Sequence, residues 1–303
     1  KICEEGYKNI CWLGIGGTWA SCLQAEVHMK EMSALDFFVE NAAEYITTGN
    51  RRVGKGTVVI LSSVTGSTVE MVDAVKKAQA DGAKVFGFID KETAELAKMV
   101  DYCISYPANE QLKFFMTADC FMKNAGEFAE YDELYAELDQ HLAKDLADVE
   151  KAADAFGEEF ARKHCEDKLH YFVGAGNQYG ATYSYAMCYW EEQHWIRTKS
   201  IHSAEFFHGM LEIVDKNTPV TVFMGEDSQR RLSERVAAFL PKVCSNYEII
   251  DTKDYPMEGI SEKFRGHISH LIMHAVTNRI DAHIEKINCH PMSIRRYYRQ
   301  FDY

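Results

Sequence analysis

Short apolar runs alternate with segments of helical spacing through the first half of the chain. The run NICWLG ends in glycines and precedes a helical pattern that continues to about Met32. The run TVVIL leads into SSVTGSTVE and a helix from about Thr68 to Ala80. Alternating strands and helices predict a parallel, doubly wound α/β sheet. Other predicted elements are strands near 37–39, 84–89 and 102–105, and helices over 41–48 and 109–127.

A polar, acidic, proline-free segment from Tyr131 to about His164 follows, with apolar residues at helical spacing. It predicts a long connecting helix that is interrupted or softened near Gly157. On this basis we divide the chain into a first domain over 1–150 and a second over 151–303.

The strand–glycine–helix pattern then restarts. A strand over 169–173 leads into GAGNQYG and a helix over 181–195. Gly14 and Gly174 lie 160 positions apart, and VVIL near Ile60 recurs as VTVF near Val222. This spacing indicates an internal duplication of one α/β unit. The copies differ after the second of these strands, where the first reads SVTGST and the second reads GEDSQRR.

Composition and charge restrict the class of protein. The chain has 303 residues, of which 47% are hydrophobic and 26% charged, as in a soluble globular protein. The net charge of −13 argues against nucleic-acid binding, and no apolar run is long enough to span a membrane. Nine cysteines form no CxxC pair, and most lie in apolar runs, so we expect reduced core residues. Together with the lack of a signal-peptide pattern, this predicts a cytoplasmic protein.

The segment SVTGST follows a strand and opens a helix, which is typical of an anion-binding loop. Backbone amides, hydroxyls and the helix dipole can converge there on a phosphate, although a simple Ser/Thr-rich helix cap gives the same pattern. Neither GIGGTW nor GAGNQYG completes a dinucleotide fingerprint, and no Walker lysine follows. The predicted phosphate contacts in this loop are Ser63, Thr65, Ser67 and Thr68.

Candidate acid–base residues lie in the second half. Glu192 is on a mostly aromatic helix, and His208 follows sixteen residues later in EFFHG. A carboxylate can move a proton between neighbouring carbons, and an imidazole can assist ring opening near neutral pH. The pair therefore suits aldose–ketose chemistry, while an exposed helix carboxylate is the ordinary alternative for Glu192.

With these segments together, the chain resembles the sugar isomerase (SIS) superfamily in its double-SIS arrangement, so we expect two tandem SIS domains. SVTGST is similar to the family's phosphate loop. GIGGT at 14–18 resembles the family's first glycine-rich turn, which implies that Gly16, Gly17 and Thr18 also contact the phosphate. The Glu192–His208 spacing is similar to the isomerase part of glucosamine-6-phosphate synthase. The segment AEFFHGMLEIVDKNTPVTVF, DSQRR and the RRYY tail resemble the fructosamine-6-phosphate deglycases. The tail lacks the lysine of the synthase and offers His290, Arg295 and Arg296 instead.

The resemblance implies an Amadori-type fructosamine 6-phosphate, such as fructoselysine 6-phosphate, as a small-molecule substrate. His208 would assist ring opening, and Glu192 would carry a proton from C1 to C2. Water would then release glucose 6-phosphate and a free amine, without any metal or organic cofactor. The resemblance also implies a homodimer with the site at the subunit interface. The alternatives are an aldose–ketose phosphosugar isomerase and a non-catalytic sugar-phosphate sensor.

Several other side chains have open roles. Glu205 and Glu212 flank His208 at i−3 and i+4, so we expect Glu205 to orient the imidazole or form a helix pair. His290 and Arg295 are candidates for the amine pocket or its closure. The spacings of His270 with His274 and of His208 with Glu212 each allow metal ligation from one helix face, but a buried, hydrogen-bonded histidine is the commoner outcome, and we expect no metal.

Overall fold

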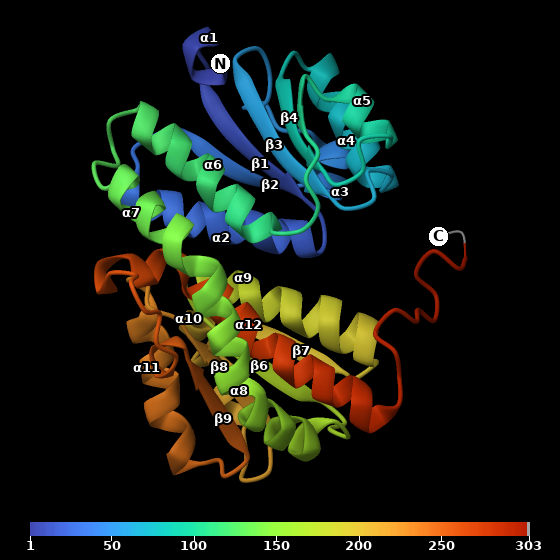
Figure 1. Cartoon of the computed structure of the whole chain (residues 1–303). Helices are drawn as coiled ribbons and strands as arrows, with labels where there is room; N and C mark the ends of the chain where they lie inside the picture. The colour runs from blue at the N-terminus through green and yellow to red at the C-terminus, as the bar shows by residue number, and fades with distance from the viewer. Residues whose placement is uncertain (302–303) are drawn as a thin grey trace. The chain divides into compact units, whose positions relative to one another are not determined.

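The computed structural model describes residues 1–301 and separates into two compact α/β units, the first over Lys1–Tyr131 and the second beginning at Asp132 (Figure 1). The boundary drawn at residue 150 from the sequence lies inside helix α8 (Ala143–His164). This helix packs along α12 (Glu262–Asn288), so residues 132–150 belong with the second unit.

The first unit is a five-stranded parallel sheet in the order β2-β1-β3-β4-β5, which confirms the predicted doubly wound class. Its side chains alternate between two covered faces. Trp12 contacts Phe114 of α6 on one face, whereas Cys11 and Leu13 join the core beneath α3 and α4 on the other. The elements are α1 (Ile2–Glu5), β1 (Asn9–Gly14), α2 (Gly17–Met32), β2 (Phe37–Asn41), α3 (Ala42–Thr48), β3 (Thr57–Ser63), α4 (Val69–Ala80), β4 (Lys84–Ile89), α5 (Glu95–Met99), β5 (Tyr102–Ile104) and α6 (Glu110–Asn124).

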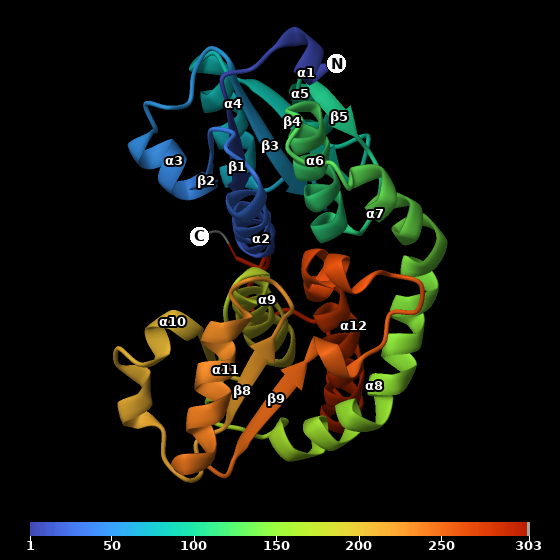
Figure 2. The same cartoon turned by 90° about the vertical axis from the view of Figure 1, so that its left-hand side faces the viewer.

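The second unit is a four-stranded parallel sheet in the order β7-β6-β8-β9. Helices α10 and α11 cover one face, and α8 and α12 cover the other (Figure 2). The elements are β6 (His170–Gly174), α9 (Asn177–Ser184), the π-helix η2 (Tyr185–His194), β7 (Thr198–His202), α10 (Ser203–Phe206), β8 (Val220–Met224), α11 (Arg230–Phe239) and β9 (Tyr247–Asp251). Single 3-10 turns are η3 (Met210–Ile213), η4 (Leu240–Lys242) and η5 (Thr252–Asp254).

The two sheets confirm the internal duplication. In each unit the first strand lies between the second and the third, and the fourth pairs with the third. β2-β1-β3-β4 in the first unit therefore corresponds to β7-β6-β8-β9 in the second. The cap of the short helix after the second strand is also repeated. The side chain of Asn41 accepts hydrogen bonds from Ala43 and Glu44, and His202 accepts one from Ala204.

The interruption predicted at Gly157 is wrong, because α8 runs through it without a break. A Cβ at Gly157 would lie 2.9 Å from the backbone carbon of Arg279 and 3.0 Å from the nitrogen of Ile280. The glycine therefore permits close approach of α12 rather than a break in α8. The irregular segment lies earlier, at the π-helical turn η1 (Leu138–Leu142) that follows α7 (Tyr131–Glu137).

The cysteine prediction was partly wrong. All nine thiols are free, but only Cys11, Cys22 and Cys244 are buried, and Cys103, Cys120 and Cys289 are exposed. Apolar neighbours in sequence did not imply burial for the three exposed cysteines, because Cys103 lies in an edge strand, Cys120 on a helix surface and Cys289 at a helix end. Among the described residues, no helix is both long and apolar enough to cross a membrane.

Candidate functional site

The glycine turn after β1 leaves the amino end of α2 open. Gly16 caps the helix at φ +60°, and a Cβ built on it would meet no described atom within 4 Å. Gly14, by contrast, lies so close to the helix that a Cβ would be 2.6 Å from the backbone nitrogen of Trp19. The turn therefore presents helix N–H groups, among them those of Gly17 and Thr18, to an open space. The Thr18 hydroxyl donates to Glu110 at 3.0 Å, which leaves its amide as the group for an anion.

The second candidate phosphate loop follows β3. The Ser63 hydroxyl accepts a hydrogen bond from the Gly66 amide at 3.0 Å, and Thr65 accepts one from Ser67 at 3.4 Å. Gly66 has φ +62°, and a Cβ there would lie 2.4 Å from that of Ala94. The side chain of Thr68, the residue before α4, makes no capping bond to the helix. The first turn of α4 therefore keeps N–H groups available for an incoming anion.

Both loops of the first unit emerge at one edge of its sheet. β1 and β3 are adjacent and parallel, with Ile10 opposite Val58, and each loop follows the carboxyl end of its strand. Parallel strands direct their carboxyl ends to the same edge, which is where open α/β sheets bind ligands. The structure thus brings the predicted residues 16–18 and 63–68 to the same edge of the sheet.

The equivalent edge of the second unit is filled by the protein's own carboxylate. Gly176 caps α9 at φ +63°, as Gly16 caps α2, but a Cβ there would lie 2.2 Å from the carboxylate oxygens of Asp227. Asp227 accepts hydrogen bonds from the amides of Asn177 at 2.8 Å and Gln229 at 2.9 Å. An anion therefore already occupies the amino end of α9.

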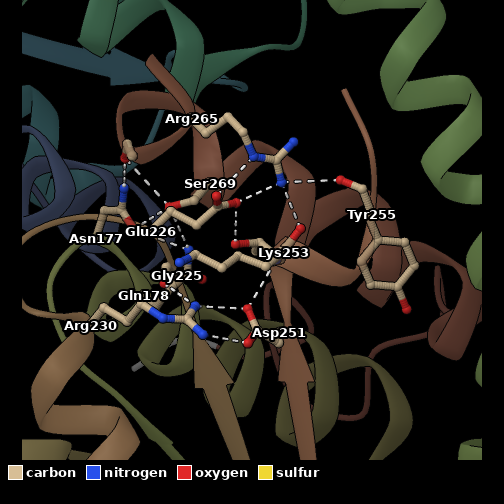
Figure 3. Close-up of polar contacts among 12 residues, drawn as sticks. Asn177, Gln178, Gly225, Glu226, Arg230, Asp251, Lys253, Tyr255, Arg265 and Ser269 are labelled. Carbon is tan, nitrogen blue, oxygen red and sulfur yellow. Dashed lines mark hydrogen bonds and ion pairs between the residues drawn. The ribbon is translucent and has the colours of Figure 1, made fainter. Parts of the chain in front are cut away.

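Ion pairs close the rest of this edge (Figure 3). Arg265 of α12 contacts both carboxylate oxygens of Glu226 at 2.7 and 2.8 Å, and Arg230 similarly pairs with Asp251. The Glu226 side chain is only 5% exposed. The sequence reading noted GEDSQRR as a divergence but missed its function. The signal was present, because acidic side chains replace the small hydroxyl residues of the first copy.

Glu192 lies on the π-helix η2, where the sequence predicted an ordinary helix. Its carboxylate is 33% exposed and accepts a hydrogen bond from Nε of Arg295 at 2.7 Å. Its neighbour Glu191 instead turns to Thr198, accepting bonds from the amide at 3.2 Å and the hydroxyl at 2.9 Å. Of the two adjacent carboxylates, Glu191 is thus part of the local structure and Glu192 faces the C-terminal tail.

A buried carboxylate fixes both ends of η2. The Tyr185 hydroxyl donates to Oδ1 of Asp281 at 3.1 Å, and Nε2 of His194 lies 2.9 Å from the same oxygen. Burial raises the pKa of Asp281, while its bond to His194 lowers it. Burial also raises the pKa of Tyr185 well above its usual range. π-Helical segments are frequent at functional sites, and this one holds Glu192 between two residues that are both anchored to Asp281 of α12.

His208 is not on a helix, contrary to the pairings considered from the sequence. α10 ends at Phe206, and His208 lies in an exposed turn before η3. The helix-face spacing with Glu205 and Glu212 is therefore lost, and in residues 1–301 no hydrogen bond joins the side chains of Glu205 and His208. Only their backbones are linked, by the His208 amide donating to the Glu205 carbonyl at 3.0 Å.

Within one subunit the structure does not bring His208 to Glu192. Glu191 bonds to Thr198 at the start of β7, whereas His208 follows the far end of that strand through α10. The five residues of β7 separate these two ends, and a strand rises about 3.3 Å per residue. His208 and Glu192 of one chain therefore lie at opposite ends of the strand.

The C-terminal tail, by contrast, is joined to the end of η2. Trp195 ends η2 in a left-handed conformation, with φ +60°. The ring of His290 lies 4.1 Å from that of Trp195, and the guanidinium of Arg296 lies 4.2 Å from it. This tilted ring contact and the cation–π contact place the tail, including Arg295, against the segment that holds Glu192.

One histidine cluster was missed by the sequence reading. His164 and His170 each place Nδ1 on the same oxygen of Asp167, at 2.7 and 2.8 Å, and Nε2 of His170 contacts Thr221 at 2.8 Å. Burial lowers the pKa of His170 to about 4, and the pKa of Asp167 falls to about 2 through its bonds to the imidazoles, against the effect of burial. The three residues have the spacing of a metal site, but their ligand atoms already bond to one another. The HxxxH pair His270 and His274 lies on α12, where His270 is buried.

Comparison with known proteins gives matches over part or most of the chain. The sequence profile of the SIS domain matches residues 6–120. The chain is 27% identical to fructosamine deglycase FrlB of Bacillus subtilis, over 97% of this chain and 92% of that protein. It is 22% identical to fructoselysine 6-phosphate deglycase of Escherichia coli, over 93% and 83%. A solved Bacillus subtilis structure, described as a candidate phosphosugar isomerase, aligns with a TM-score of 0.93 at 25% identity, covering 98% of this chain and 93% of that one.

Proposed function

The chain belongs to the SIS domain family, and from this premise we propose that it is a fructosamine-6-phosphate deglycase. Its substrate would be an Amadori product, in which an amine is attached to C1 of fructose 6-phosphate. Water would convert it to glucose 6-phosphate and the free amine. The protein would be cytoplasmic and would need neither a metal nor an organic cofactor.

The phosphate would bind to the first unit. The amides after Gly16 and the loop Ser63–Thr68 supply donors at one sheet edge, and two helix amino ends favour a dianion there. The second unit would not bind a phosphate, because Asp227 occupies the equivalent position. One phosphosugar per chain follows from this difference between the copies.

The observation that carries the choice of a deglycase is Arg295 beside Glu192. An aldose–ketose isomerase handles a substrate whose only anion is its phosphate. An amino acid linked through its α-nitrogen brings a second anion close to the reacting carbon, and a guanidinium beside the base is suited to it. The similarity to two proteins named as deglycases over more than nine-tenths of this chain points the same way.

In the proposed mechanism, His208 opens the sugar ring by moving a proton between the ring oxygen and the anomeric hydroxyl. Glu192 then takes the proton from C1, the C1–H electron pair forms a C1–C2 double bond, and the carbonyl oxygen at C2 gains a proton. Return of a proton to C2 gives an imine at C1. Water adds to this imine and the C1–N bond breaks, so that no external oxidant or reductant is required.

Glu192 and His208 would have to come from different subunits to act on one sugar. Within a chain they lie at opposite ends of β7, Glu192 before the strand and His208 after it, so a homodimer that places one subunit's His208 near the partner's base would complete the site. We therefore propose a homodimer with two composite sites.

The test is an end-point assay with fructoselysine 6-phosphate, coupled to glucose-6-phosphate dehydrogenase. Wild type should release glucose 6-phosphate and lysine in equal amounts, and Glu192→Ala and His208→Ala should each lose at least 100-fold in kcat, as expected for an acid–base group. Glu191→Gln is the matched control and should retain activity, since Glu191 bonds to Thr198. Interconversion of glucose and fructose 6-phosphates without amine release would favour the isomerase, and phosphosugar binding without turnover the sensor.

A further inference from the structure

The guanidinium of Arg295 is only partly used by the protein. Nε donates to Glu192 at 2.7 Å, and Nη1 donates to the carbonyl oxygens of Met292 and, at 3.1 Å, of Ile294. Within residues 1–301, Nη2 makes no hydrogen bond. The Arg295 side chain is 21% exposed and Glu192 33%, so solvent and small solutes reach the pair.

This arrangement leaves one edge of the guanidinium half occupied. Carboxylates bind arginine most strongly by taking two parallel N–H groups on one edge, here Nε and Nη2. Glu192 uses one of those groups through one oxygen. A second carboxylate that takes both groups must therefore displace Glu192 from Nε.

The displacement has a chemical consequence. While Oε1 of Glu192 accepts the charge-assisted bond from Arg295, the carboxylate is held toward the guanidinium, and among the described residues only Oε2 is left without a hydrogen bond to receive a proton from carbon. Arg295 cannot move far, because the contacts of His290 and Arg296 with Trp195 hold the tail beside η2. The guanidinium therefore stays in place while its carboxylate partner changes.

We propose that Arg295 is a carboxylate-exchange residue, at which the carboxylate of the substrate's amino-acid part replaces Glu192 and so frees it to act as the base. The inference rests on the proposed deglycase function and deepens it by giving the substrate's own carboxylate a part in releasing the base. Arg295 is both a specificity residue and a positioning residue for Glu192.

Two substrates that differ by one group test this. A panel of amino-acid adducts of fructose 6-phosphate identifies the one that wild type cleaves fastest, and this adduct is compared with its decarboxylated analogue. Wild type should prefer the carboxylated adduct by at least tenfold in kcat/KM, as expected for a charged bidentate contact. Arg295→Met should lose that preference.

The turnover rate of the decarboxylated analogue distinguishes an exchange of carboxylates at Arg295 from simple binding of the substrate's carboxylate. With the decarboxylated analogue, Arg295→Met should turn over about two- to fivefold faster than wild type, because the ion pair that holds Glu192 is gone. Added acetate should likewise accelerate wild type with this analogue but not the variant. Arg299→Met removes a neighbouring tail charge and should behave as wild type in both assays.

Equal kcat of wild type and Arg295→Met with the decarboxylated analogue, and no effect of acetate, would overturn the exchange while leaving the deglycase intact. Absence of amine release from every adduct would instead overturn the deglycase, and with it this inference. A circular dichroism spectrum and melting curve like those of wild type establish that Arg295→Met is folded.

Discussion

Asp227 accepts a hydrogen bond from the backbone amide of Asn177 at 2.8 Å, at the amino end of α9. The equivalent helix end in the first unit, after Gly16, is open. The aspartate supplies the negative charge that the amino end of a helix favours. In the second unit the carboxylate is therefore a built-in counterpart of the phosphate expected in the first.

Replacing Asp227 by alanine should expose this helix end. We expect a loss of about 1 kcal/mol in the free energy of unfolding, the usual size of a lost cap, measured by urea denaturation. Inorganic phosphate should restore part of that loss. Asp254→Ala, which removes an exposed acidic residue in η5, should show neither effect. Equal phosphate responses of the two variants would mean that the helix end does not hold an anion.

Gly66→Ala should impair the phosphate loop. The residue has φ +62° and its added Cβ would lie 2.4 Å from Ala94 and 2.8 Å from Ile89, so the loop must shift. We expect KM for the phosphosugar to rise at least tenfold. Gly6→Ala is the control, because Gly6 also has a positive φ, +79°, but its Cβ would meet open space. A similar KM for both variants would indicate that the loop does not contact the phosphate.

A dimer with shared sites predicts complementation. Glu192→Ala and His208→Ala should each be inactive alone, but a heterodimer of the two contains one site with both residues intact. After subunit exchange, about half of the dimers in an equal mixture are mixed, and each has one complete site. The mixture should then reach about a quarter of wild-type activity. Exchange verified by mass spectrometry without any recovery would place both residues in one subunit.

Stability should fall as the pH drops from about 6.5 to about 4, in part because of His170. Burial lowers its pKa to about 4 from 6.5, so the unfolded chain takes up a proton in this window that the folded chain does not. Between pH 7 and pH 5 this linkage amounts to about 2 kcal/mol. His164 acts in the opposite direction, since its bonds to Asp167 and Glu248 raise its pKa despite burial, and its contribution is lost as the pH rises.

The check is urea unfolding of wild type and His170→Gln at both pH values. The variant is expected to be less stable at each pH, because it loses contacts with Asp167 and Thr221. Its loss of stability between pH 7 and pH 5 should nevertheless be smaller by about 2 kcal/mol. Parallel pH profiles for the two proteins would show that the imidazole of His170 remains accessible to protons.

The fold was predictable because its signals are local. Apolar runs such as TVVIL mark strands covered on both faces, and glycines followed by helical spacing mark the strand-to-helix turns. The repeat of these signals at a nearly constant offset gave the duplication. The predicted anion loops needed only one further rule, that adjacent parallel strands end at the same edge.

The contacts that define the second half of the site are not local. Arg295 bonds to Glu192 from 103 positions away, and Asp281 reaches His194 from 87. No period or motif encodes such pairs, since they depend on how α12 and the tail pack against η2. The spacing of His208 to Glu212 is compatible with one helix face, but the chain leaves the helix after Phe206. Spacing alone does not establish that a segment is helical.

The π-helix also has a counterpart in the lengths of the two copies. Gly16 and Gly176 are 160 positions apart, whereas the capping residues Asn41 and His202 are 161 apart. The second copy has thus gained one residue relative to the first between its glycine turn and its short capped helix. A π-helical turn accommodates one extra residue, and each residue turns an α-helix by about 100°. The two copies therefore differ by the insertion of one residue as well as by substitutions. At an offset of 160 Glu31 of the first copy corresponds to Glu191, and at an offset of 161, after the extra residue, it corresponds to Glu192.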